Sequence, residues 1–147
     1  MEWIVLDACV AIKWFAAEVG TEHAVKLLEN PDTLFLAPDI FPAEVANGLL
    51  RQHREGHLTQ ALLEAALAEL GTVMPQLLSS VDLLEPAVAL GRQLGHPVYD
   101  CLYLALADRS ETVFVTADEK FIDRCRKRLG DDPLVSRLRV LQEYSPS

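Results

Sequence analysis

The chain has 147 residues, half of them hydrophobic, which is enough for one domain with a buried core and too few for two. Acidic residues outnumber basic ones by 22 to 13, and the formal net charge of -9 has the wrong sign for a protein that holds nucleic acid by overall electrostatic attraction. Contact with RNA or DNA would therefore depend on local basic patches and bound cations.

The cysteines and the apolar runs indicate how the fold is stabilised and where in the cell the protein is located. Three cysteines at wide spacings, without a CxxC pair, argue against a disulfide framework and against structural zinc; they are Cys9, Cys101 and Cys125. The first apolar stretch is interrupted by charged residues, and the longest later one, residues 101–107, is too short to cross a bilayer. We expect a cytoplasmic protein without a membrane span.

The first element is the apolar run Trp3-Ile4-Val5-Leu6, which favours a short strand buried on both faces, as in the interior of a parallel sheet. Asp7 follows at its carboxyl end. Ligands of open α/β sheets bind at this edge, and the residues after Asp7 are again apolar. A carboxylate in such surroundings needs a partner.

Short apolar runs and helix-forming segments alternate along the rest of the chain. Strands are expected at residues 34–37 and 112–116, with an edge strand at 73–78 and a half-exposed last strand at 135–141. Helices are expected at residues 8–15, 21–30, 39–56 with Asp39 as its N-cap, 59–70, 82–94, 99–109 and 118–129. This alternation predicts a parallel sheet in a three-layer α/β/α domain. We expect the domain to span residues 1–142, followed by a C-terminal tail at 143–147.

Four acidic residues stand in apolar surroundings or directly after strands. Glu44 lies one to two turns into a helix between Phe41 and Ala46, and Asp100 is the one charge near the start of an apolar helix. Asp7 and Asp118 follow strands. Strand ends and the following helix N-termini share one edge of a parallel sheet, so we expect the four carboxylates to converge there.

Each of these acids has an alternative interpretation. Asp7, Asp100 and Asp118 are also suitable N-caps or first-turn residues, and Glu44 could point into solvent. Converging carboxylates need a cation to neutralise them, and oxygen ligands suit Mg²⁺ or Mn²⁺. Such an ion lowers the pKa of bound water and neutralises phosphate charge, which indicates phosphodiester hydrolysis. The histidines are expected on polar, turn-like or helix-surface positions rather than as ligands; they are His23, His53, His57 and His96.

Four segments, in this order, carry a resemblance to a known family. They are Val5-Leu6-Asp7 with Ala11 to Phe15, Ala37-Pro38-Asp39 with Glu44 to Asn47, Val98-Tyr99-Asp100 with Leu102 to Ala107, and Val115-Thr116-Ala117-Asp118. Together they resemble the PIN domain, specifically the VapC-type toxin ribonucleases of toxin–antitoxin pairs. The resemblance implies a PIN-like nuclease domain and a metal-dependent endoribonuclease. It implies that Asp7, Glu44, Asp100 and Asp118 hold Mg²⁺ or Mn²⁺ and activate water.

The resemblance also implies supporting residues and partners. Thr116 matches a hydroxyl beside the last acid, and Asn47 matches a polar residue one turn from Glu44. A homodimer is implied, as is an antitoxin whose C-terminal segment lies in the acidic cleft, where an arginine would block both metal and RNA. Arg51 and Arg54 belong to a local basic cluster that could flank the cleft and contact RNA. A second cluster, at residues 124–128, fits either that role or a solvated helix end.

Cys9 departs from the family pattern, because relatives usually carry a hydroxyl residue, often serine, two positions after the first acid. A thiol is a weaker hydrogen-bond donor, so we expect poorer support of Asp7. Two alternatives follow. A phosphatase with Asp7 as nucleophile would need an acid at position 9, where Cys9 cannot serve. A catalytically degenerate PIN-like module would act by interaction alone, in an antitoxin complex on operator DNA.

Overall fold

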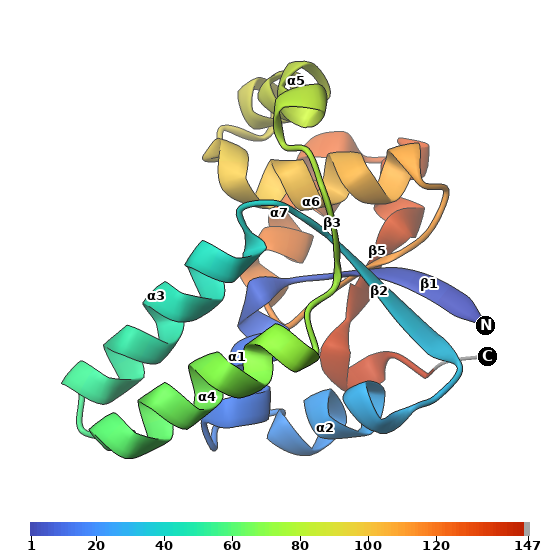
Figure 1. Ribbon diagram of the computed structural model, residues 1–147. Helices are drawn as coiled ribbons and strands as arrows, with labels where there is room; N and C mark the ends of the chain where they lie inside the picture. The colour runs from blue at the N-terminus through green and yellow to red at the C-terminus, as the bar shows by residue number, and fades with distance from the viewer. Residues whose placement is uncertain (146–147) are drawn as a thin grey trace.

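The computed structural model, described here for residues 1–145, contains a five-stranded parallel sheet of order β3-β2-β1-β4-β5 (Figure 1). The strands are β1 (Glu2–Leu6), β2 (Thr33–Pro38), β3 (Gln76–Leu78), β4 (Phe114–Thr116) and β5 (Leu138–Val140). β1 occupies the centre, and Ile4, Val5 and Leu6 are completely buried there, as their apolar side chains require. The predicted parallel α/β/α fold is confirmed.

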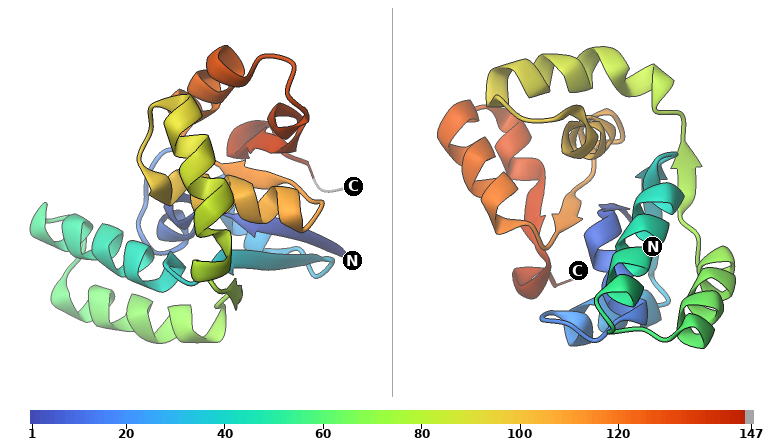
Figure 2. Two further views of the ribbon diagram at one scale, coloured as in Figure 1. Left: turned by 90° about the horizontal axis from the view of Figure 1, so that it is seen from above. Right: turned by 90° about the vertical axis from the view of Figure 1, so that its left-hand side faces the viewer.

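Helices cover both faces of this sheet, as Figure 1 and Figure 2 show. They are α1 (Ala8–Phe15), α2 (Thr21–Glu29), α3 (Phe41–Arg54), α4 (Gln60–Thr72), α5 (Leu84–Leu94), α6 (Val98–Arg109) and α7 (Glu119–Leu129). α6 packs directly on the sheet, and α5 packs on α6, so that every residue from Cys101 to Ala107 is buried. α1 packs against α2 and α3 on the opposite face. The apolar helix predicted to be central is therefore central.

α3 and α4 form a helical hairpin that projects beyond the sheet (Figure 2). Its base is held close to α1, because a Cβ atom at Gly48 would lie 2.1 Å from Ile12 Cδ1. Only glycine permits this approach. The contact fixes the N-terminal half of α3, which carries Glu44, beside the helix that follows Asp7.

Several predicted boundaries need correction. Asp39 does not cap α3: the N-cap position is Ile40, and the backbone N–H of Asp39 donates to Leu78 O (2.9 Å). The last strand is β5 alone, because residues 133–137 form a 3₁₀ turn that begins with Pro133 and is capped by the side chain of Asp132. The predicted edge strand is confirmed at the sheet edge but begins only at Gln76.

The end of the described chain is attached to the sheet. A short 3₁₀ turn, Leu141–Glu143, follows β5, and the Tyr144 hydroxyl donates a hydrogen bond to the Glu2 carboxylate at the start of β1. The chain thus stays in contact with the domain beyond residue 142, where we expected a tail to begin; residues 146–147 lie outside the described part. Within residues 1–145, no helix is both long and apolar enough to span a bilayer.

Candidate active site at the carboxyl edge of the sheet

Asp7 lies where β1 ends, between the two neighbouring strands. It occupies the N-cap position of α1, yet its side chain makes no capping bond. Instead Oδ2 accepts a hydrogen bond from the Thr116 hydroxyl at the end of β4 (2.6 Å). The residue is only 7% exposed, and burial, reinforced by the charges of Asp100 and Glu44, raises its pKa to about 7. Asp7 thus holds the N-cap position that the alternative interpretation gave it, but its side chain bonds to Thr116 instead of capping the helix.

Glu44 approaches from α3 and is held by a phenol from α6. The Tyr103 hydroxyl donates to Glu44 Oε1 at 2.6 Å, and Tyr103 is completely buried. Burial raises the pKa of Glu44, the Tyr103 hydrogen bond opposes this, and the charge of Asp100 adds to it. The side chain of Glu44 thus faces the protein rather than pointing freely into solvent.

Asp100 is the third residue of α6, so it is a first-turn acid of this helix, as the alternative interpretation allowed, and the N-cap position belongs to Pro97. Its Oδ2 lies 2.6 Å from Nε2 of His96, four residues earlier. The ring of His96 packs against Phe121 of α7, with ring centroids 4.9 Å apart. His96 lies in the turn between α5 and α6, as expected, but its side chain contacts both Asp100 and Phe121.

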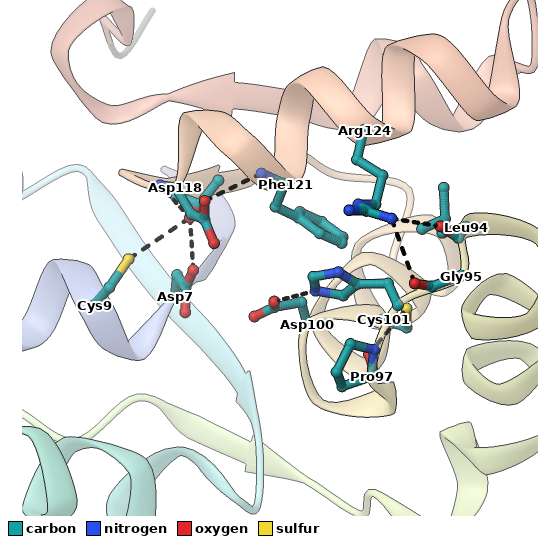
Figure 3. Close-up of polar contacts among 12 residues, drawn as sticks. Asp7, Cys9, Leu94, Gly95, Pro97, Asp100, Cys101, Asp118, Phe121 and Arg124 are labelled. Atoms are coloured by element: carbon teal, nitrogen blue, oxygen red, sulfur yellow. Dashed lines mark hydrogen bonds and ion pairs between the residues drawn. The ribbon is translucent and has the colours of Figure 1, made fainter.

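Asp118 differs from the other three acids. Its Oδ1 accepts the backbone N–H of Phe121 (3.1 Å), so its side chain caps α7. Its own N–H donates to Thr116 Oγ1 (3.0 Å), the same hydroxyl that donates to Asp7. Figure 3 shows Asp7, Asp100 and Asp118 around one space, with the Asp118 carboxylate beside Asp7. The capping alternative is correct for Asp118, which still adjoins the other acids.

We call Asp7, Glu44, Asp100 and Asp118 the acidic site. Within residues 1–145, no lysine or arginine forms an ion pair with any of them. The mutual repulsion that contributes to the raised pKa of Asp7 is thus left without a basic side chain to relieve it. This donor set, made of oxygen atoms, fits a hard divalent cation.

The fit does not require a preformed cage. In the part of the chain that the structure describes, no three acidic, histidine or cysteine side chains converge tightly enough to hold an ion as they stand. Mg²⁺ commonly binds through one or two carboxylates and keeps several of its waters. Asp7, Asp100 and Glu44 therefore suit this ion with water completing its shell.

The remaining predicted site residues have diverse surroundings. Cys9 Sγ lies 3.6 Å from Thr116 Oγ1, and burial together with the Asp7 charge raises the pKa of the thiol, so Cys9 stays neutral. Asn47 is exposed one turn beyond Glu44 on α3. Arg51 and Arg54 are exposed in the last two turns of the same helix. Two turns separate Arg51 from Glu44, which places both on one side of α3.

Two site residues were missed in the sequence. Tyr103 was noted only as part of a motif, and His96 was set aside. A signal existed for each: a phenol inside a wholly apolar helix needs a hydrogen-bond partner, and His96 precedes Asp100 by four residues. Neither signal names the partner, because the Tyr103–Glu44 contact joins residues 59 positions apart.

Comparison with known proteins agrees with this fold. The model of the PIN domain family matches residues 4–127. This chain belongs to the PIN domain family.

Within this family, curated relatives show which proteins the chain is similar to. Ribonuclease VapC3 of Mycobacterium tuberculosis is 34% identical over 119 residues, covering 81% of this chain and 85% of the relative. Ribonuclease VapC3 of Pyrobaculum aerophilum is 28% identical over 123 residues, covering 82% of this chain and 93% of the relative. The resemblance to VapC-type proteins is confirmed. A toxin–antitoxin complex from Klebsiella pneumoniae contains a chain of the same fold, with a TM-score of 0.58 and 18% identity over 96% of this chain and 99% of that one.

Proposed function

We propose that this protein is a toxin-type endoribonuclease that cleaves RNA phosphodiester bonds with a carboxylate-held Mg²⁺ or Mn²⁺. The observation that carries the proposal is the buried Asp7, whose pKa is raised to about 7 by burial and by two neighbouring carboxylates without a basic counterion. The relatives named ribonucleases support RNA as the substrate.

Asp7, Glu44 and Asp100 would hold the cation, with Asp118 beside them. When bound, the cation lowers the pKa of a coordinated water and neutralises charge on the phosphate. The protein side chains orient the ligands: Thr116 fixes Asp7 Oδ2, Tyr103 fixes Glu44 Oε1, and His96 fixes Asp100 Oδ2. Each of these bonds uses one oxygen of its carboxylate.

RNA cleavage with and without metal tests this proposal. We expect cleavage of single-stranded RNA in Mg²⁺ or Mn²⁺, none in EDTA, and a loss of about 10²-fold in Asp100→Asn. Asp82→Asn, an exposed acid outside the site, is the matched control and should cleave normally. Equal cleavage by Asp100→Asn and the wild type would refute the assignment. Hydrolysis of small phosphomonoesters in preference to RNA would indicate the phosphatase instead.

Partners and location are part of the same proposal. An antitoxin arginine that reaches the acidic site would displace metal and RNA together. A homodimer would cover exposed apolar side chains of the α5 region, such as Val81, Leu84 and Val88. We place the protein in the cytoplasm. Co-expression with a cognate antitoxin should suppress cleavage, and sedimentation should show twice the monomer mass.

A further inference from the structure

Positive charge is concentrated on α7, although the chain as a whole is acidic. Five of its thirteen lysines and arginines lie in this helix. Four of them, with Asp123, line a shallow hollow of about 420 Å³; they are Lys120, Arg124, Lys127 and Arg128. We call these four the basic face. Their successive spacings of four, three and one residues place them along one side of the helix.

The packing of α7 turns this side outward. The opposite side of the helix is formed by Phe121, Ile122, Cys125 and Leu129, which are all buried. All four members of the basic face are exposed. The helix is therefore strongly amphipathic, with its charged side available to a ligand.

Complementation of the helix dipole explains only part of this charge. Lys127 and Arg128 are in the last turn, where cations stabilise a helix. Lys120 is in the first turn, where a cation is unfavourable, and Arg124 is in the middle. The helix itself therefore gains nothing from a cation at Lys120.

Protein counterions do not account for the charge either. Within residues 1–145, no salt bridge involves a member of the basic face, although Asp123 precedes Lys127 by four positions. Arg124 Nη1 donates to the backbone carbonyls of Leu94 (3.3 Å) and Gly95 (3.4 Å), neutral groups that leave its charge in place (Figure 3). The members of the basic face are thus not engaged in ion pairs with carboxylates of the described residues.

The basic face begins next to the acidic site. Asp118 caps α7, and Lys120 follows two residues later. Phe121 contacts the ring of His96, which is hydrogen-bonded to Asp100. From Lys120 to Arg128 the face extends about 12 Å along the helix axis, at 1.5 Å per residue. A chain of phosphates that passes through the acidic site can therefore continue along α7.

We propose that the basic face binds the phosphates of the RNA strand adjacent to the cleaved bond, an inference that rests on the proposed function. Lysine and arginine bind phosphates without reading bases, so this contact supplies affinity rather than sequence specificity. The basic face would attract RNA locally, although the net charge of the protein is negative. An acidic protein segment is the competing ligand for the same charge.

A binding experiment that does not require cleavage separates this inference from the proposed function. The probe is a labelled oligouridine in EDTA, followed by fluorescence anisotropy over a range of salt concentrations. The variant is Lys120→Gln/Lys127→Gln, which spares Arg124 and its backbone contacts. The control is Lys26→Gln/Arg109→Gln, which makes the same change in net charge at exposed residues of α2 and α6. Circular dichroism confirms that both are folded.

We expect the variant to bind oligouridine about fivefold to tenfold more weakly than the control, and its salt dependence to be shallower by about 1.4 in log–log slope. Cleavage by the same variant should show a raised KM with kcat unchanged. Equal affinity and slope in variant and control would overturn the inference. Oligoglutamate serves as a probe for an acidic protein segment. If the variant lost oligoglutamate binding but kept RNA binding, the inference would also be overturned. If RNA binding depends on the basic face but the wild type does not cleave, the binding of RNA phosphates by this face is supported and the proposed cleavage fails.

Discussion

The acidic site and the basic face of α7 are neighbours of opposite charge that differ in how they are held. The acids are partly or fully buried and hydrogen-bonded to Thr116, Tyr103 and His96, whereas the lysines and arginines extend from an exposed helix side. A buried carboxylate cluster suits a small, hard cation that needs fixed ligands. Exposed flexible cations suit a phosphate chain. Neither set neutralises the other by a direct ion pair, which leaves both charges for ligands.

The largest effect is expected from Asp7→Asn, which keeps the shape of the side chain and removes its charge. RNA cleavage should fall by about 10³-fold, because the central carboxylate of the cluster is lost. Oligouridine binding through the basic face should remain. Single-turnover cleavage and anisotropy on the same protein measure the two effects. A parallel loss of cleavage and oligouridine binding would show that the acidic site and the basic face do not act separately.

The stability of the metal-free protein should depend on pH through Asp7. Its pKa is about 7 when folded and 3.8 in its ordinary environment, so the unfolded state loses this proton first. The free energy of unfolding should therefore fall as pH rises from about 4 to 7, by up to about 4 kcal/mol from this group. Urea unfolding in EDTA, compared with Asp7→Asn, isolates the effect. A constant difference between the two proteins across this pH range would contradict it.

His96→Ala tests whether the bond to Asp100 supports the acidic site. We expect Mn²⁺ affinity to fall about 10-fold to 100-fold, as is typical when the partner of a metal ligand is removed. His96→Gln, which can still donate a hydrogen bond, should recover part of it. Unaltered Mn²⁺ affinity in His96→Ala would show that Asp100 needs no such support.

Thr116→Val removes a hydroxyl that serves both Asp7 and the N–H of Asp118. Loss of this bond should raise the pKa of Asp7 further, moving the acidic limb of the pH–rate profile upward. Stability should fall by about 1 kcal/mol. Thr116→Ser keeps the hydroxyl and should behave as wild type. Identical pH–rate profiles for Thr116→Val and Thr116→Ser would show that the hydroxyl does not control the pKa of Asp7.

The smallest effect is expected from Cys9→Ser. The thiol already contacts Thr116, and the serine hydroxyl offers a stronger donor at the same place. Cleavage should rise by no more than about threefold. A larger gain in cleavage would mean that the weak hydrogen bond of the thiol limits the activity of the acidic site. A loss of cleavage would mean that the size of the Cys9 side chain matters more than its strength as a donor.

The sequence predicted what depends on local pattern and on the topology of parallel sheets. β-branched runs located most strands, and the convergence of strand ends brought Asp7 close to Asp118. The pairings of Tyr103 with Glu44 and of His96 with Asp100 depend on side-chain positions between packed helices, which no periodicity encodes. The 3₁₀ turn before β5 was missed because Val135 fits a strand pattern, while Pro133 and Asp132 decide the backbone there.

The central claim is that Asp7, Glu44 and Asp100 form one cation site. Calorimetric titration of the metal-free protein with Mn²⁺ tests it without substrate. We predict saturable binding that releases protons near pH 7 and is abolished in Asp7→Asn. Absence of binding in a folded wild type, or equal binding by Asp7→Asn, would contradict the claim.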